Sequence, residues 1–463
     1  MNPLPFTPGP EDLWFLPLGG SGEIGMNLNL FGHDGAWLII DCGVTFEDTA
    51  KGQQVQMADP AFIAERSEQL AGFIVTHAHQ DHFGAVPWLW PMLEKPVYTT
   101  PFTANVLLGK LRRERVDAPV ITVKEGSTHQ FGPFRVTWLP ITHSTPETNA
   151  LLIETPVGRI LHTADWKIDE TPVVGDGFDA NLWRSLGDID AVVCDSTNAL
   201  TPGRSVSEAA LAADLAAEIR TARGRVVVGC FASNIARLQT LGYVAEQTGR
   251  YVALLGRSLQ QMAQSAKASG YLKVSFNAIS PHDMGYLPRD EVLVIATGSQ
   301  GEPGAALRRL ADDTHPELNL DPGDRVLYSS RAIPGNEARI ERLNRQFAER
   351  GVEVVHADNS NRLLHASGHP CQDELADLFG WVRPRIVVPV HGEPKHIDAN
   401  AEIARQAGVP VSLAGRNGDL FRLGSTPSVL RNAIPAPRMA VDDRGRFVPA
   451  LEPVPPLGGQ API

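Results

Sequence analysis

Cysteine is scarce in this chain of 463 residues, and no two cysteines form a CxxC pair. The four that occur, Cys42, Cys194, Cys230 and Cys371, lie far apart, which argues against a disulfide framework or a zinc knuckle. A run of about 18 apolar residues is also missing, and the start has no basic stretch before an apolar core. These absences predict a cytoplasmic protein without a membrane partner.

An excess of positive charge is missing as well. Asp and Glu number 53 against 41 Lys and Arg, a formal net charge of −12. This balance argues against a protein that coats nucleic acid, but it allows a nuclease, because bound metal ions and a local basic groove can attract phosphate. The hydrophobic fraction of 43% and the length are those of a globular chain with two or three domains.

The first 200 residues have the pattern of short strands separated by glycine-rich turns. We expect strands at 13–18, 36–41, 72–76, 134–139, 150–154 and 159–163. From about 206 the pattern changes to strands followed by helices, such as "RVVVGC", "EVLVIATGS" and the helical "NEARIERLNRQFAER". That alternation predicts parallel βαβ units.

These patterns predict four parts of the chain. A first domain covers 1–205, an inserted α/β domain covers 206–365, and residues 366–427 complete the first domain with a helix near 372–381, the strand "RIVVPV" and a second helix. Residues 428–463 are expected to form a proline-rich, extended or disordered tail, because seven prolines occur among the last 31 residues without an amphipathic period.

The segment "THAHQDH" at 76–82 follows the apolar run "GFIV" and is typical of a two-metal site. Residues two apart at a strand end point to the same side, so His77 and His79 can bind one ion, while the following turn presents Asp81 and His82 to another. His143, Asp165 and His391 each follow a predicted buried strand and are further ligand candidates.

Such a set of histidines and carboxylates predicts two divalent ions, Zn²⁺ in the first place and Mn²⁺ as the alternative, rather than Mg²⁺, which prefers oxygen ligands. Two ions held by a bridging carboxylate activate water for attack on phosphorus or on a carbonyl carbon. The sequence therefore predicts a hydrolase.

The motifs "IDCG", "THAHQDH", "THS", "HTADWK" and "PVHGE" together resemble the metallo-β-lactamase fold, a four-layer αββα sandwich, and the inserted α/β segment resembles a β-CASP domain. With "FLPLGGSGEIGMN", "DSTNA", "FASNIARLQ", "TGSQGEP", "IPGNEARI" and "HASGH", residues 12–423 resemble the ribonuclease J family. Members of that family usually continue into a further C-terminal domain that supports dimers or tetramers, whereas this core is expected to end near 425.

The resemblance implies a dimetal ribonuclease that degrades RNA from a 5′-monophosphate end in the 5′-to-3′ direction and also cuts internally. It implies that His77, His79 and His143 bind one ion and Asp81, His82 and His391 the other, with Asp165 bridging and Asp41 in support. The expected partners are RNA, a second copy of the chain, and other RNA-decay proteins.

The resemblance also implies roles beyond the metal ligands. Asp195 and His369 would protonate the leaving oxygen or orient the phosphate, and we expect Asp195 to raise the pKa of His369 so that it acts as general acid. The family positions around the 5′-phosphate correspond to Ser233, Asn234, His365, Ser367, Gly368 and His369. Helix capping is the alternative role for the polar residues of "FASN" and for Ser367.

Three other interpretations remain open on the sequence alone. The same metal scaffold also occurs in hydrolases of small lactones, thioesters or phosphodiesters. A non-catalytic RNA-binding subunit would keep the fold, and DNA repair relatives also carry β-CASP domains.

The basic run 110–115, "KLRRER", either contacts an RNA backbone or forms a solvated helix face.

Overall fold

The computed structural model describes residues 6–273, 276–333, 335–442 and 444–454, which form two compact units. The first unit contains the chain up to residue 170 together with residues 177–205 and 368–453. The second contains residues 171–176 and 206–367, nearly the span predicted for the inserted domain. Each unit has its own sheets and its own core.

The first unit contains an eight-stranded sheet in which adjacent strands run mainly antiparallel at one edge and parallel at the other. In spatial order its strands are β23 (Ser428–Leu430), β22 (Leu420–Arg422), β1 (Trp14–Gly19), β2 (Leu28–His33), β3 (Ala36–Ile40), β6 (Leu70–Ile74), β7 (Val97–Thr99) and β8 (Val120–Thr122).

A seven-stranded sheet packs against it. In order its strands are β21 (Val411–Ser412), β20 (Ile386–Val390), β13 (Ala191–Asp195), β12 (Gly158–His162), β11 (Asn149–Thr155), β10 (Phe134–Pro140) and β9 (Thr128–Phe131). Side chains such as Phe15 and Phe31 from the first sheet and Trp138 and Val193 from the second form the apolar layer between them.

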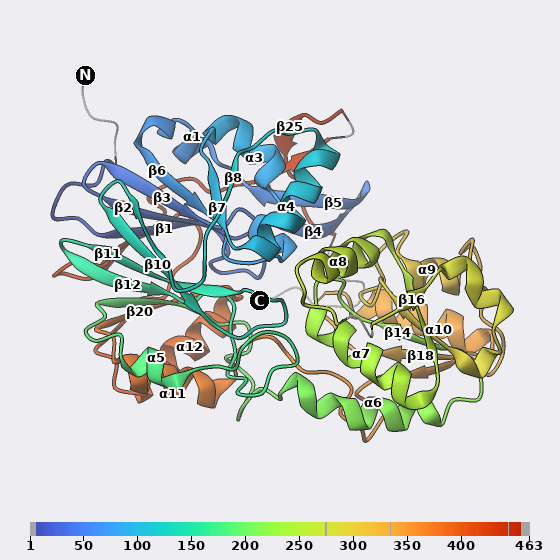
Figure 1. Cartoon of the computed structure of the whole chain (residues 1–463). Coiled ribbons are helices and arrows are strands. Elements are labelled where there is room, and N and C mark those ends of the chain that lie inside the picture. The colour runs from blue at the N-terminus through green and yellow to red at the C-terminus, as the bar shows by residue number, and fades with distance from the viewer. Residues whose placement is uncertain (1–5, 274–275, 334, 443, 455–463) are drawn as a thin grey trace. The chain divides into compact units, whose positions relative to one another are not determined.

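Helices cover the outer face of each sheet (Figure 1). On the eight-stranded sheet lie α1 (Ala61–Ala64), α3 (Val86–Leu93) and α4 (Pro101–Glu114), whose Phe62, Leu89 and Leu107 join the core there. On the seven-stranded sheet lie α5 (Ala180–Arg184), α11 (Gln372–Val382) and α12 (Pro394–Gln406). Because each sheet buries both of its faces, the result is the predicted αββα sandwich.

A four-stranded sheet completes the first unit: β25 (Phe447–Pro449), β24 (Arg438–Val441), β5 (Gly52–Ala58) and β4 (Val44–Thr49). β24 pairs antiparallel with β5, with Met439 opposite Met57. The expectation of a tail without regular structure is therefore wrong for residues 428–449; the rest of that expectation, from 455 on, lies outside the described residues. The prolines delimit short strands here rather than preventing them.

The second unit has a parallel sheet with helices connecting its strands, as the alternating pattern predicted. Its strands, in spatial order, are β16 (Ala278–Ile279), β15 (Tyr251–Leu255), β17 (Val292–Ala296), β14 (Val226–Gly229), β18 (Arg325–Tyr328) and β19 (Glu353–Val355). Its α-helices are α6 (Leu211–Arg220), α7 (Ile235–Thr248), α8 (Arg257–Ala268), α9 (Ala306–Ala311) and α10 (Glu337–Glu349).

Within the described ranges, no helix is both long enough and apolar enough to cross a membrane.

Candidate metal centre

The predicted ligands follow strands whose carboxyl ends meet at one edge of the sandwich. β3 and β6 are parallel neighbours in one sheet, and β12, β13 and β20 are parallel neighbours in the other. At three of these strand ends the backbone is left-handed, with φ of 67° at Asp41, 52° at Ala164 and 54° at His391. Non-glycine residues seldom adopt this conformation, and where they do it often accompanies a functional site.

His77, His79 and His143 form a first group around Asp165. His77 Nε2 and His143 Nε2 lie 3.7 and 3.8 Å from Asp165 Oδ2, and His79 Nδ1 lies 3.1 Å from His143 Nε2. The ligand atoms of all four residues lie within 4.8 Å of one another, so they could hold one metal ion. The Gly368 carbonyl accepts from His143 Nδ1 at 2.6 Å, which leaves Nε2 of that ring for the ion.

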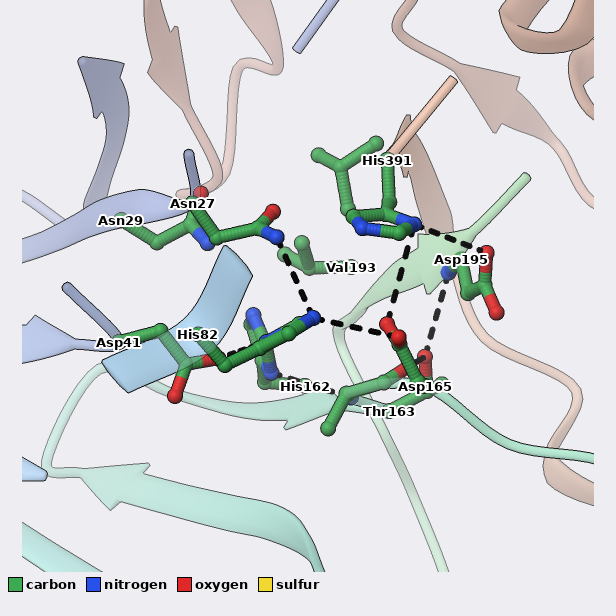
Figure 2. A pocket seen from close by; sticks show the side chains of 12 residues that line it. Asn27, Asn29, Asp41, His82, His162, Thr163, Asp165, Val193, Asp195 and His391 are labelled. Atoms are coloured by element: carbon green, nitrogen blue, oxygen red, sulfur yellow. Dashed lines mark hydrogen bonds and ion pairs between the residues drawn. The ribbon is translucent and has the colours of Figure 1, made fainter. Parts of the chain in front are cut away.

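Asp81, His82 and His391 form a second group around the same Asp165. His82 Nε2 lies 3.2 Å from Asp165 Oδ2, and Asp81 Oδ2 lies 3.5 Å from His82 Nε2 and 3.1 Å from His391 Nε2. Figure 2 shows His82, His391 and Asp165 turned toward one another. The structure thus brings together all seven predicted ligands, with Asp165 common to both groups.

Residues behind the ligands fix which nitrogen each histidine presents. The Asp41 carboxylate accepts from His82 Nδ1 at 2.7 Å and from the backbone N–H of Thr76 at 2.8 Å. Thr197 Oγ1 lies 2.7 Å from His391 Nδ1 and donates to Asp195 Oδ1 at 2.7 Å. The supporting roles of Thr76 and Thr197 were not predicted from the sequence. Their only signal in the sequence is a hydroxyl close to a strand end, beside His77 in one case and near Asp195 in the other.

The electrostatics differ between the two groups. Burial lowers the pKa of His77 and His143 well below the ordinary value and that of His79 to about 4, so these rings are neutral and available as ligands. Burial also lowers the pKa of His391, but Asp165 and hydrogen bonds to Asp195 and Asp81 outweigh it and raise the pKa to about 10. The carboxylates therefore create a negative field that favours a cation.

These residues fit a pair of divalent ions. His77 Nε2 is buried and has no hydrogen-bond partner among the described residues, although it faces Asp165. Imidazole nitrogens and carboxylate oxygens are the donors that Zn²⁺ and Mn²⁺ accept. A cavity of about 10 Å³, lined by residues that include Asn29, His82, His162 and Asp165, adjoins the second group and has the volume of about one water molecule (Figure 2).

His369 lies beside the two groups. Its Nδ1 is 2.7 Å from Asp195 Oδ2 and 4.0 Å from Asp165 Oδ2. Burial lowers the pKa of His369, but the charges of Asp195 and Asp165 outweigh burial and raise it above the ordinary value. A protonated imidazole at this point can donate a proton, with Nδ1 held by Asp195.

The residues predicted to surround a 5′-phosphate belong to both units. Ser233, Asn234, His365 and Ser367 lie in the second unit, and Gly368 and His369 lie in the first. The Asn234 side chain accepts from the backbone N–H of Arg237 at 2.8 Å and caps α7, so the capping role is real for this residue. Ser367 does not cap the next helix, because α11 begins after Cys371.

The basic run 110–115 divides between the core and the surface. Lys110 is only 8% exposed; its Nζ donates to Gln80 Oε1 at 2.6 Å and lies 4.9 Å from the ring centroid of Trp88. Arg112 and Arg113 are exposed. An RNA contact is therefore excluded for Lys110, which instead supports the segment that carries the ligands.

Family models match three consecutive parts of the chain. Residues 26–194 match the metallo-beta-lactamase superfamily, residues 223–346 match the beta-CASP domain of ribonuclease J, and residues 352–414 match the Zn-dependent metallo-hydrolase RNA specificity domain. The match to the metallo-beta-lactamase superfamily implies that this chain binds a divalent metal.

Relatives and a solved structure agree with these matches. Ribonuclease J of Sinorhizobium meliloti is 42% identical over 93% of this chain and 78% of its own length, and that of Mycolicibacterium smegmatis is 38% identical over 95% and 79%. A crystal structure of an Enterococcus faecalis protein of unknown function shares the fold, with a TM-score of 0.62 at 16% identity over 89% of this chain and all of that one. The chain therefore belongs to the ribonuclease J family of metal-dependent hydrolases.

Proposed function

We propose that this protein is a cytoplasmic dimetal ribonuclease that shortens RNA from a 5′-monophosphate end in the 5′-to-3′ direction and also cuts internally. The observation that carries the proposal is the pair of ligand groups that share Asp165. Relatives named ribonuclease J and the match to an RNA specificity domain support RNA as the substrate.

In this proposal the first group, His77, His79 and His143, and the second group, Asp81, His82 and His391, would each hold one ion, Zn²⁺ or Mn²⁺, and Asp165 would serve both groups. When bound, such a pair supplies Lewis-acid polarisation of the phosphate and an activated water near neutral pH. Asp41 and Thr197 keep the rings of the second group in the orientation that presents Nε2.

His369 delivers the proton that the leaving oxygen requires. Its Nδ1 is engaged by Asp195 at 2.7 Å, so Nε2 is the nitrogen that can face the substrate. The raised pKa of His369 keeps the ring protonated before the phosphodiester bond breaks, and Asp195 stabilises that charge.

Recognition of the 5′-phosphate is assigned to Ser233, Asn234, His365, Ser367 and Gly368. Asn234 caps α7, and the N–H groups and the dipole at a helix N-terminus favour an anion. His365 lies 3.3 Å through Nδ1 from the Ser329 carbonyl, which limits how its ring can turn.

The test is a time course with 3′-labelled RNA and DNA of equal length that carry 5′-monophosphate, triphosphate or hydroxyl ends, in Mn²⁺ or Zn²⁺. Progressive shortening of the 5′-monophosphate RNA is the expected result, with His77→Ala as the inactive control. If the RNA stays intact with every metal, the result would favour a small-molecule hydrolase or a non-catalytic RNA-binding subunit instead. Equal degradation of DNA would favour a repair nuclease.

A further inference from the structure

The loop from Gly20 to Asn27 has the sequence "GSGEIGMN". It contacts Asp81, His82 and His391, the three ligands that belong to the second group alone. The Gly20 carbonyl accepts the backbone N–H of His391 at 2.6 Å. Asn27 donates to the Asp81 carbonyl from its backbone N at 2.9 Å and from Nδ2 at 3.0 Å, and Nδ2 lies 3.2 Å from His82 Nε2. This loop therefore holds the backbone of Asp81 and His391 and contacts the ring of His82.

The first group lacks such contacts. Across the described part of the chain, no hydrogen bond joins residues 20–27 to His77, His79 or His143. Those three residues are held instead by Thr76, Ser144 and Gly368. A change confined to the loop should reach one ion and leave the other unaffected.

Glu23 fixes the loop from within. Its Oε1 accepts from the backbone N–H of Gly20 at 3.4 Å and from the side chain of Asn417, whose own Oδ1 accepts the backbone N–H of Ser21 at 2.8 Å. Gly20 has φ of +85°, and a glycine-rich loop loses much conformational entropy when it is ordered. The loop therefore depends on contacts of this kind to stay in one conformation.

Arg438 on β24 completes the support. Its guanidinium forms an ion pair with Glu23 Oε2 and a second one with Glu47 Oε1 at 2.8 Å, and it donates to Gln56 Oε1 at 3.3 Å. Glu47 and Gln56 lie on the β4–β5 hairpin, to which β24 is paired. Arg438 is thus attached to a sheet on one side and to the ligand-supporting loop on the other.

We propose that the Glu23–Arg438 pair is a positioning element for the metal centre that sets the affinity of the second ion and leaves the first unchanged. The proposal rests on the metal site of the proposed function. Residues that orient metal ligands typically change metal affinity about 10- to 100-fold when they are replaced. Because this pair acts through the loop, the expected loss is about tenfold, at the lower end of that range.

The experiment is a Mn²⁺ titration of the metal-free, full-length protein, in which the unbound Mn²⁺ is followed by its EPR signal. Wild type should bind in two steps, and His391→Ala identifies the step that belongs to the second group. Arg438→Gln and Glu23→Gln should each weaken that step about tenfold, and the double variant should be no weaker than either, because the two residues act as one pair.

Arg446→Gln is the matched control, since Arg446 pairs with Asp442 inside the β24–β25 segment and, among the described residues, forms no hydrogen bond or ion pair with the loop. It should titrate like wild type. Unchanged steps in both Arg438→Gln and Glu23→Gln, or equal weakening of both steps, would overturn the positioning role while leaving the two-ion site intact. Failure of wild type to bind two ions would overturn the site and this inference together.

Discussion

Asp41→Asn tests whether the support behind the ligands controls the second ion. Asp41 is fully buried, and its carboxylate accepts from the Thr76 backbone N–H and from His82 Nδ1. An asparagine must keep its oxygen on the Thr76 N–H, because that group only donates, so the amide nitrogen then faces His82 Nδ1. His82 must move its proton to Nε2, the nitrogen that lies 3.2 Å from Asp165.

The magnitude follows from the bond that is lost. A hydrogen bond to a charged group contributes about 1.5–3 kcal/mol. Since about 1.4 kcal/mol corresponds to tenfold in affinity, the second ion should bind roughly 10- to 100-fold more weakly in Asp41→Asn. The first ion should be affected much less, because Asp41 reaches His77 only through the Thr76 hydroxyl, which can still donate to the asparagine oxygen. A two-step Mn²⁺ titration of the metal-free protein measures both affinities.

Asp324→Asn is a control for the burial of an amide where a carboxylate was. Asp324 is also fully buried, lies in the second unit and accepts the backbone N–H of Arg225 at 2.7 Å. This variant should keep the wild-type titration. Two wild-type steps in Asp41→Asn, or the same loss in Asp324→Asn, would refute the argument from the His82 tautomer.

Other variants separate the remaining roles. Asp165→Ala removes the oxygen that both groups share, so metal binding and RNA cleavage should be lost while circular dichroism shows a folded protein; cleavage in purified, metal-controlled samples would contradict the bridging role. His369→Gln should keep RNA affinity but slow single-turnover cleavage by about 10²- to 10⁴-fold, the range for a lost general acid, and an unchanged rate would remove it from the mechanism. Asn234→Asp keeps an N-cap acceptor for α7, so the melting temperature should hold, whereas the added charge should reduce the preference for 5′-monophosphate RNA over 5′-hydroxyl RNA; an intact preference would leave Asn234 as a cap only. Thr197→Val removes the hydroxyl between His391 and Asp195 and should lower the free energy of unfolding by about 1 kcal/mol in urea titrations, so wild-type stability would show that water replaces it.

The sequence predicted the strands and ligands that have local signals. The strand ends that carry histidines and aspartates could be predicted because a buried apolar run precedes each of them, as "RIVVPV" precedes His391. Parallel pairing then brings such ends together, so spacing along the chain was enough to anticipate the gathering of His77, Asp165 and His391.

The parts that were missed depend on distant partners. β24 looked like a tail because its own sequence is short and flanked by prolines, and it becomes a strand only by pairing with β5. Lys110 looked like part of a basic surface because charge says nothing about burial; Gln80 and Trp88 keep it inside. The Glu23–Arg438 pair joins residues with no local pattern in common.

Because the second unit interrupts the first along the chain, the two ligand groups are completed at different times during synthesis. Every member of the first group precedes residue 206, whereas the second requires His391, which follows a strand that must pair with β13 after the inserted residues have been made. On the ribosome, the ligands of the first ion emerge long before those of the second are complete. For the proposed nuclease, a growing chain therefore cannot cleave the message that encodes it until the ribosome has passed the inserted unit and the strand that leads to His391.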